Sequence, residues 1–269
     1  MAEPASMPGK LRSSASHLAS RTYSSGVLDS FLETFGLRAP PDIDQKAVGW
    51  SALLEERYRT LRVRRWPGWR VQAYNEILYA VVRVTRPRVL LETGVEHGLS
   101  SSYLLAALRD NDLGTLHSIE IGPPGGWQPG PPTPGELPAS EVARIGSAIP
   151  PQLRGRWNLH VGSAQDQLPR LLRELGKIDL FFHDSDHSED HMLWEYRTAW
   201  EYLPEGGWLV SDDIDFNRAF DRFGHDVAGV PWRWIGAKPR RGLLRKGGPF
   251  LPPSVTNEYR DTPRGQNHG

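Results

Sequence analysis

The chain contains no cysteine, which excludes disulfide bonds, thiolate metal sites and a catalytic cysteine. No run approaches the about 20 apolar residues that a membrane-spanning helix needs. The first 25 residues also lack the apolar stretch of a secretory signal. We therefore expect an intracellular, cytoplasmic protein without a membrane partner. Lys+Arg and Asp+Glu both number 32 and the formal net charge is zero, which argues against nucleic-acid binding through the overall field.

The 269 residues are 38% hydrophobic and 10% aromatic, which is adequate for the core of a globular protein. Residues 1–25, rich in Ser, Ala, Pro and Gly, are expected to be a disordered tail, and residues 247–269 a second, loose tail. Between them we expect an N-terminal helical cap over 26–87 and a core over 88–246. A Pro- and Gly-rich stretch at 122–138 is either a cover for a functional site or a plain solvated loop.

Apolar residues at helical spacing predict N-terminal helices over residues 27–35, 45–61 and 71–84. From residue 88, near-continuous apolar runs alternate with helical patterns. The runs predict strands over 88–93, 115–121, 157–161, 178–183 and 207–211. The segments between them predict helices over 99–109, 139–148, 165–175 and 188–203. A helix over 216–223 and an antiparallel hairpin, with 232–235 facing 243–245, complete the chain. This alternation is typical of an α/β, Rossmann-like, doubly wound sheet, mostly parallel and here of seven strands, with helices on both faces.

A glycine-bearing turn follows the first predicted strand of the core, between Glu92 and Ser100. Gly94 permits a backbone turn that a side chain would block, and Gly98 allows the chain to approach a bound ligand closely. Glu96 stands where a dinucleotide-binding turn has its middle glycine, and a carboxylate there would repel a pyrophosphate. The turn therefore favours a ligand without phosphates.

Glu120 ends the second predicted strand of the core, one strand away from the glycine turn. A carboxylate in this position can accept hydrogen bonds from both hydroxyls of a ribose. A surface glutamate at the end of a strand would be an ordinary feature if it stood alone. Together, the turn and the acid predict a nucleoside-type cofactor.

Two acidic clusters follow neighbouring apolar runs. Asp184 and Asp186 come directly after the strand predicted at 178–183, and Asp212 and Asp213 follow the next strand along the chain. Because the carboxyl ends of parallel strands meet at one edge of a sheet, we expect these carboxylates to converge. Converging carboxylates need a cation, a shared proton or a hydrogen-bonding partner. Adjacent aspartates after a strand also often cap the next helix, so the second cluster has a structural alternative.

From about residue 71 to residue 235 the chain resembles the class I S-adenosylmethionine-dependent O-methyltransferases. The likeness is greatest to the small-molecule enzymes that use a divalent metal, which include a catechol type and an antibiotic-sugar type. The glycine turn resembles the methionine-binding turn of that family, Glu120 its ribose-binding acid, and residues 162–165 its adenine-side loop. The resemblance implies S-adenosylmethionine as the cofactor, in a site formed by Glu92, Thr93, Gly94, Gly98, Ser100, Ser101, Glu120, Ser163, Ala164 and Asp184.

The resemblance also implies a metal site. Asp184 stands where the family's fourth strand delivers an acid to the metal, and Asp212 and Asp213 match the acid pair after the fifth strand. Three carboxylates suit Mg²⁺ or another divalent cation. Such a cation lowers the pKa of an acceptor hydroxyl, while a nearby base removes its proton.

Two residues are candidates for that base. The D-x-D pattern of the antibiotic-sugar type favours Asp186. His187 stands roughly where the catechol type carries a lysine, and a histidine is suited to proton transfer near neutral pH. His183 and His191 are expected to be structural.

The sequence therefore predicts an S-adenosylmethionine-dependent, divalent-metal-assisted O-methyltransferase acting on a small-molecule hydroxyl. The acceptor is expected to be a natural-product sugar, as in antibiotic biosynthesis, or a phenol or catechol. Two alternatives remain open: a metal-independent small-molecule methyltransferase, and a catalytically retired binding module of the same fold. No nucleic-acid partner is expected. The N-terminal helices are expected to cover the acceptor side or to form the interface of a homodimer or larger homo-oligomer.

Overall fold

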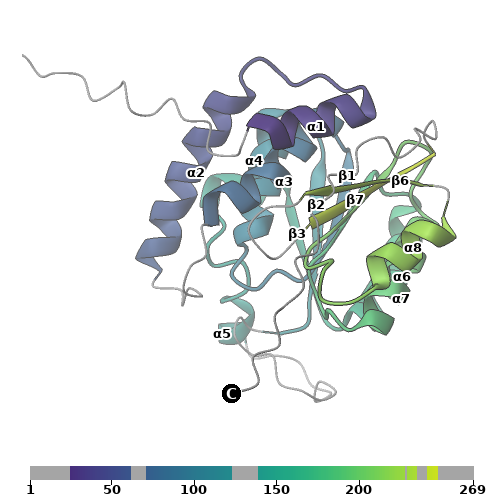
Figure 1. The fold of residues 1–269 in the computed structure, drawn as a ribbon. Helices are drawn as coiled ribbons and strands as arrows, with labels where there is room; N and C mark the ends of the chain where they lie inside the picture. Colours follow the sequence, from purple (N-terminus) through teal and green to yellow (C-terminus); the bar gives the residue numbers. More distant parts are fainter. Residues whose placement is uncertain (1–24, 62–70, 123–138, 228, 235–240, 248–269) are drawn as a thin grey trace, which may run out of the picture. The chain divides into compact units, whose positions relative to one another are not determined.

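The structure, a computed structural model, describes residues 25–61, 71–122, 139–227, 229–234 and 241–247 (Figure 1). The chain divides into two units, residues 1–167 and residues 168–269. The predicted tails and nearly all of the predicted loop at 122–138 lie outside the described residues.

The first unit contains three parallel strands in the order β3-β2-β1. They are β1 (Val89–Thr93), β2 (Thr115–Glu120) and β3 (Trp157–Val161). The register pairs Thr93 with Ile119 and Glu120 with Val161, so the strands end at the same edge. Leu90 and Leu91 of β1 are both fully buried. Successive buried residues are what a parallel strand covered on both faces requires.

Helices pack against one another in this unit (Figure 1). Ile77, Leu78 and Val81, on the predicted apolar face of α3, are each 1% exposed. Helix α3 contacts α4, and α2 contacts both of them, so α2, α3 and α4 form one layer. The bounds are α1 (Ser25–Phe35), α2 (Ile43–Thr60), α3 (Val71–Thr85), α4 (Leu99–Asp110), α5 (Ala139–Val142) and the 3-10 helix η2 (Pro151–Arg156). Helix α6 (Ala164–Leu175) runs across the boundary between the units.

The second unit contains four strands in the order β4-β5-β7-β6. Strands β4 (Leu180–His183) and β5 (Trp208–Ser211) are parallel. Strands β6 (Gly229–Trp234) and β7 (Arg241–Lys246) form the predicted antiparallel hairpin, and β7 also pairs with β5. Helices α7 (Glu189–Trp200) and α8 (Ala219–Asp226) pack against each other. The α/β, Rossmann-like, mostly parallel arrangement is as predicted.

Two predicted helices differ from the observed ones. The helix predicted at 139–148 ends at Val142, because Gly146 has φ 63° and its N–H donates to the carbonyl of Glu96 instead of continuing the helix. The helix predicted at 216–223 begins at Ala219. Its first N–H donates to the side-chain oxygen of Asn217, at 2.8 Å, and a local bond of this kind favours a turn before the helix.

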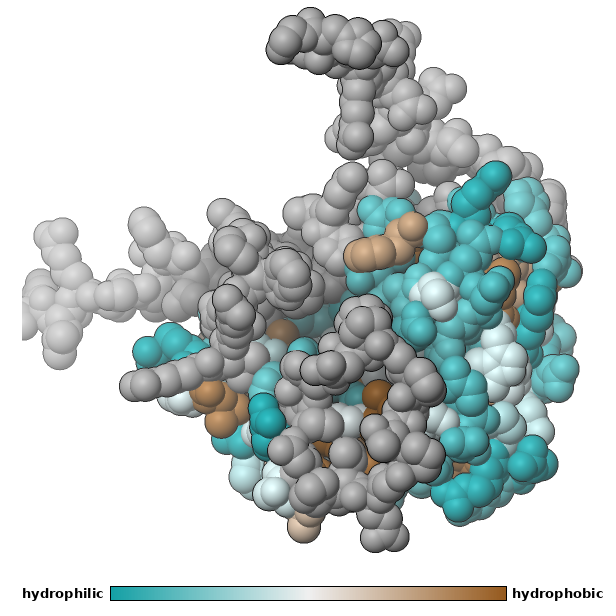
Figure 2. Space-filling model, turned by 90° about the horizontal axis from the view of Figure 1, so that it is seen from below, coloured by the Kyte–Doolittle hydropathy of each residue, from teal (hydrophilic) through white to brown (hydrophobic). Residues whose placement is uncertain are grey.

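The face of the molecule seen in Figure 2 is mainly polar. On the face seen in Figure 2, hydrophilic residues predominate and hydrophobic residues occur in small groups. The large hydrophobic side chains exposed among the described residues are Leu53, Leu61, Ile121 and Phe216. No helix in the described part of the chain is both long and apolar enough to span a membrane.

Candidate functional site

The turn between β1 and α4 depends on its two glycines. Gly94 has φ 83° and Gly98 has φ 80°, in the left-handed region that other residues rarely adopt. A Cβ atom at Gly98 would lie 2.7 Å from Cγ1 of Ile149 and 2.9 Å from Cα of Gly146, so the structure has no space for a larger residue. Glu96 also has a positive φ, 52°. Backbone strain of this kind concentrates at functional sites.

Glu120, the predicted ribose-binding acid, lies directly against this turn. Its Oε2 atom accepts hydrogen bonds from the backbone N–H groups of Val95, at 2.7 Å, and Glu96, at 2.8 Å. Its Oε1 atom accepts one from the N–H of Gly122, at 3.1 Å. A carboxylate has about four acceptor positions, so these bonds do not use them all. The structure brings the turn and the acid together, as the sequence predicted.

Glu92 and Ser101, both predicted cofactor residues, are bonded to each other inside the protein. The Oε2 atom of Glu92 accepts hydrogen bonds from the hydroxyls of Ser101, at 2.8 Å, and Ser118, at 2.7 Å. Glu92, Ser101 and the predicted Thr93 are all 0% exposed. These buried contacts order the glycine turn from within. Ser100, by contrast, is half-buried.

Ser163 and Ala164, the predicted adenine-side residues, lie at the start of α6. The Ser163 hydroxyl oxygen accepts a hydrogen bond from the N–H of Asp166, at 3.2 Å, and its O–H donates to the Asp166 carboxylate, at 2.7 Å. Ser163 therefore caps the helix. The N–H of Gly162 donates to the carbonyl of Glu120, at 2.9 Å. This bond fixes the loop beside the predicted ribose-binding acid.

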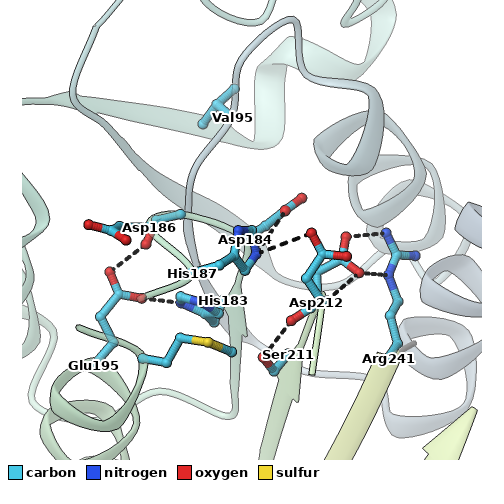
Figure 3. A network of polar contacts seen from close by, with 12 residues as sticks. Val95, His183, Asp184, Asp186, His187, Glu195, Ser211, Asp212 and Arg241 are labelled. Atoms are coloured by element: carbon cyan, nitrogen blue, oxygen red, sulfur yellow. Dashed lines mark hydrogen bonds and ion pairs between the residues drawn. The ribbon is translucent and has the colours of Figure 1, made fainter. Parts of the chain in front are cut away.

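The predicted acids and His187 follow β4 and β5 in the second unit (Figure 3). The Nε2 atom of half-buried His187 lies 4.0 Å from Oδ1 of Asp184 and 3.7 Å from Oδ2 of Asp213. Asp186 is exposed, and its Oδ1 atom accepts a hydrogen bond from the N–H of Ser188, at 2.8 Å. The structure thus brings His187, Asp184 and Asp213 together and places Asp186 at the surface before α7.

Burial shifts two of these groups in opposite directions. It lowers the pKa of His187 to about 4, with a further contribution from His183. It raises the pKa of Asp213 to about 8, and the charges of Asp212 and Asp184 add to this effect. Near pH 7 the imidazole is therefore neutral and the Asp213 carboxyl keeps its proton. Within the described residues, Nε2 of His187 and Oδ1 of Asp213 are buried without a hydrogen-bond partner.

Asp212 is held by Arg241 (Figure 3). The guanidinium Nε and Nη2 atoms of Arg241 donate to the two carboxylate oxygens at 3.3 and 3.2 Å. Both residues are buried. Oδ1 of Asp212 also accepts a hydrogen bond from the N–H of Asp213, at 2.9 Å. Asp213 has φ 48°, so the two adjacent aspartates have different conformations and different partners.

The metal site predicted over Asp184, Asp212 and Asp213 has no counterpart among the metal-holding groups of the described residues. In the part of the chain that the structure describes, no group of three or more His, Asp or Glu side chains is placed to hold a metal ion. Arg241 instead supplies a positive charge beside the Asp212 carboxylate and donates to both of its oxygens. The metal site over these three acids stays a prediction.

Glu195 on α7 was not identified in the sequence analysis, although it joins three parts of this region. Its Oε2 lies 2.6 Å from Nδ1 of His183, and its Oε1 is 2.9 Å from both the Ser185 hydroxyl and Nε2 of His191. Burial alone would raise the pKa of Glu195, but the two histidines lower it well below its usual range. The acid ties the end of β4, the following loop and α7 together. In the sequence, only the four-residue spacing between His191 and Glu195 on a predicted helix indicated that the two side chains would meet.

The two units together have the elements of a Rossmann-like methyltransferase fold: a glycine turn and an acid after parallel strands in the first unit, and acids after parallel strands in the second. Solved structures share this fold. An O-methyltransferase from Bacillus cereus, in complex with SAH, has 16% identity and a TM-score of 0.52, and the match covers 74% of this chain and 91% of that one. The O-methyltransferase TomG from Streptomyces achromogenes, in complex with SAM, has 18% identity and a TM-score of 0.52, covering 82% and 96%. Cofactor-bound Rv0187 from MTB has 18% identity and a TM-score of 0.52, covering 81% and 95%.

Residues 91–214 match the family described as a methyltransferase domain. No curated protein sequence matches the chain. The family match covers less than half of the chain; together with the shared fold, it supports the methyltransferase class predicted from the sequence.

Proposed function

We propose that the protein transfers the methyl group of S-adenosylmethionine to a hydroxyl oxygen of a small molecule. The methyltransferase domain and the fold shared with O-methyltransferases support this proposal. The observation that carries it is the environment of His187. Its Nε2 atom is buried, has no hydrogen-bond partner among the described residues, and lies within 4.0 Å of Asp184 and 3.7 Å of Asp213.

His187 is the general base in this proposal. As the acceptor oxygen bonds to the methyl carbon, the bond from that carbon to sulfur breaks, and the hydroxyl proton moves to Nε2 of His187. The lowered pKa keeps the imidazole neutral near pH 7 but also makes it a weak base, so the proton transfer depends on the Asp184 carboxylate nearby. The nearby Asp184 carboxylate then stabilises the imidazolium. Asp186 is the weaker candidate, because it is exposed and already accepts a hydrogen bond from the N–H of Ser188.

The glycine turn and Glu120 bind the cofactor in this proposal. Gly94 and Gly98 give the turn a shape that allows close approach of the methionine part. Glu120 accepts a hydrogen bond from a ribose hydroxyl at its remaining acceptor position, and its contacts with the N–H groups of Val95 and Glu96 support this role by holding the carboxylate against the turn. Buried Glu92, Thr93 and Ser101 act from behind the turn.

Divalent-metal assistance is a second candidate, favoured by the buried, unpartnered Oδ1 atom of Asp213 among the described residues. A carboxylate oxygen is the kind of ligand that Mg²⁺ prefers. Asp184 and Asp213 would hold the ion, without Asp212, and substrate or water oxygens would complete its shell. When bound, the ion would lower the pKa of the acceptor hydroxyl.

The test is formation of S-adenosylhomocysteine from S-adenosylmethionine with panels of phenol, catechol and sugar acceptors, measured by mass spectrometry. We expect turnover with at least one hydroxyl acceptor, its loss in His187→Ala and its retention in Asp186→Ala. Loss of activity with EDTA and recovery with Mg²⁺ would establish the metal-assisted form, and insensitivity to EDTA the metal-independent one. Cofactor binding without turnover on any acceptor would instead identify a binding module.

The predicted partners remain part of this proposal. They are a small-molecule acceptor and a second copy of the chain in a homodimer or larger homo-oligomer. A nucleic-acid partner is not expected. A cytoplasmic location likewise remains a prediction.

A further inference from the structure

Residues 146–149, named here the bracing segment, are hydrogen-bonded to the glycine turn. The N–H of Gly146 donates to the carbonyl of Glu96, at 2.9 Å, and the N–H of Ala148 donates to the carbonyl of His97, at 2.8 Å. The side chains of His97 and Ser147 are also hydrogen-bonded, at 2.9 Å. Two successive residues of the turn are therefore fixed by a segment about 50 residues further along the chain.

Side-chain packing joins the bracing segment to the turn as closely as these hydrogen bonds do. The empty Cβ position of Gly98 lies 2.7 Å from the Ile149 side chain and 2.9 Å from the Gly146 backbone. Gly146 itself has φ 63°, and its own Cβ position would lie 2.4 Å from the Trp157 ring. Because no space separates these groups, a shift of the bracing segment would displace the turn.

Two guanidinium groups hold the carbonyl groups of the bracing segment. Arg57, on α2, donates to the carbonyls of Ala148 at 2.7 Å, Ser147 at 3.0 Å and Ile149 at 3.4 Å. Arg154, on η2, donates to the carbonyls of Gly146 at 2.6 Å and Ile149 at 3.3 Å. All four consecutive carbonyls thus have a charged donor, and hydrogen bonds of this kind are stronger than neutral ones.

Arg57 and Arg154 converge although they carry the same charge. Partial burial lowers the pKa of Arg154, and the charge of Arg57 lowers it further. The electrostatic repulsion between the two guanidinium groups is offset by the backbone carbonyl groups to which they donate. Arg57 is the more informative of the two, because it belongs to the N-terminal helical layer and is far from the glycine turn in sequence.

We propose that Arg57 is a positioning residue for the cofactor turn, so that helix α2 sets the affinity for S-adenosylmethionine. The proposal rests on the proposed function, which assigns the turn to the cofactor. It gives the N-terminal layer a role in cofactor binding, in addition to the acceptor or interface roles expected from the sequence. Arg57 acts through residues 146–149 and does not itself need to touch the cofactor.

The test is calorimetric titration of S-adenosylmethionine into Arg57→Ala, together with steady-state kinetics. We expect the Kd and the KM for the cofactor to rise about tenfold, because several charged hydrogen bonds that shape the turn are lost. The kcat at saturating cofactor should stay within about twofold, since the reacting groups are unchanged. Arg57→Lys keeps the charge but cannot reach three carbonyls in the same geometry, so it should recover only part of the affinity.

Two controls separate positioning from general stability. Arg59 lies on the same helix, is exposed and pairs with Glu56, so Arg59→Ala should bind the cofactor like the wild type. Arg83 is buried and pairs with Asp42 at 2.6 Å, so Arg83→Ala destabilises the same helical layer without touching the bracing segment. An equal loss of affinity in Arg83→Ala, or an unchanged Kd in Arg57→Ala, overturns the proposal.

Hydrogen exchange of the cofactor-free protein distinguishes this inference from the proposed function. Arg57→Ala should speed exchange in peptides covering residues 94–99 and 144–150, and Arg83→Ala should not do so selectively. If the wild type binds no S-adenosylmethionine but Arg57→Ala shows this change, the proposed function fails and the positioning role stands. If exchange in both segments is unchanged, the positioning role fails, whatever the cofactor affinity of the wild type.

Discussion

Replacing Arg241 by Met would leave the Asp212 carboxylate buried without its charged partner. The two side chains are 1% and 6% exposed, and the guanidinium donates to both carboxylate oxygens, at 3.3 and 3.2 Å. Removing one member of such a pair costs about 3–5 kcal/mol, because the remaining charge loses its counter-charge while it stays out of water. Asp212 would keep the hydrogen bond from the N–H of Asp213. We therefore expect the free energy of unfolding to fall by about 3 kcal/mol, the lower end of that range.

Urea denaturation followed by circular dichroism measures this effect in a double-mutant cycle. The variants are Arg241→Met, Asp212→Asn and the combination of both. The double variant contains no buried unpaired charge, so it should be more stable than Arg241→Met alone. Arg197→Met is the matched control, because Arg197 and Asp226 form a pair whose side chains are 57% and 58% exposed, and such surface pairs contribute about 0–1 kcal/mol. The reasoning is refuted if Arg241→Met costs no more than this control, or if the two substitutions are simply additive.

Four further predictions concern single groups. Gly98→Ala should lose about 1–3 kcal/mol of stability in urea denaturation through backbone strain alone. The variant should also bind the cofactor more weakly in calorimetry. Wild-type values in both measurements would contradict the positive φ and close packing of Gly98. His187→Ala should lower kcat by about 10² or more, and a kcat near that of the wild type would remove His187 as the base. The pKa of Asp213 is raised from 3.8 to about 8, so between these pH values the folded state binds more protons than the unfolded state and stability falls as pH rises. Asp213→Asn should flatten this fall between pH 6.5 and 8, measured by thermal unfolding in the presence of EDTA. An unchanged slope would be evidence against the raised pKa. Because the hydrogen bond to Glu195 raises the pKa of His191 against the effect of burial, Glu195→Gln should lower the His191 pKa in an NMR titration, and no change would show that the contact is absent in solution.

The sheet and its acidic edge could be predicted from the sequence because both follow from local rules. A buried parallel strand appears as a continuous apolar run, and residues 178–183 and 207–211 have that pattern. The observed register pairs His183 with Ser211, so Asp184 and Asp212 do follow neighbouring strands at the same edge. The glycine turn and Glu120 likewise meet as expected, since β1 and β2 are parallel neighbours.

The partner of Asp212 could not be predicted in the same way. Arg241 lies 29 residues away along the chain, in a basic stretch that gave no sign of which arginine would be buried. Asp184, Asp212 and Asp213 suggested a cation, and the structure adds an internal positive charge, Arg241, beside Asp212. Glu195 was missed for a similar reason, because two of its partners, His183 and Ser185, lie on the preceding strand and loop.

The helix predicted at 139–148 shows how long-range contacts override local propensity. Residues 143–148 have a helical pattern, but several of their backbone groups bond to distant residues, namely the carbonyls of Glu96 and His97 and the guanidinium of Arg57. A glycine with positive φ at 146 then ends any continuation of the helix. Nothing within ten residues of this segment specifies those contacts.

The direction of β7 determines the charge at the acidic edge. In a sheet of parallel strands, each strand brings its last residues to the carboxyl edge, and here Asp184 and Asp212 directly follow the last residues of β4 and β5. Because β7 runs antiparallel to β5, with Gly242 opposite Ser211, it brings its first residue to that edge instead, and this residue is Arg241. Side chains alternate between the two faces of a strand, so a one-residue shift in the pairing of β7 with β5 would turn the arginine to the opposite face. The register of β7 thus determines whether the cluster of aspartates is balanced by an internal positive charge or left to attract an external one.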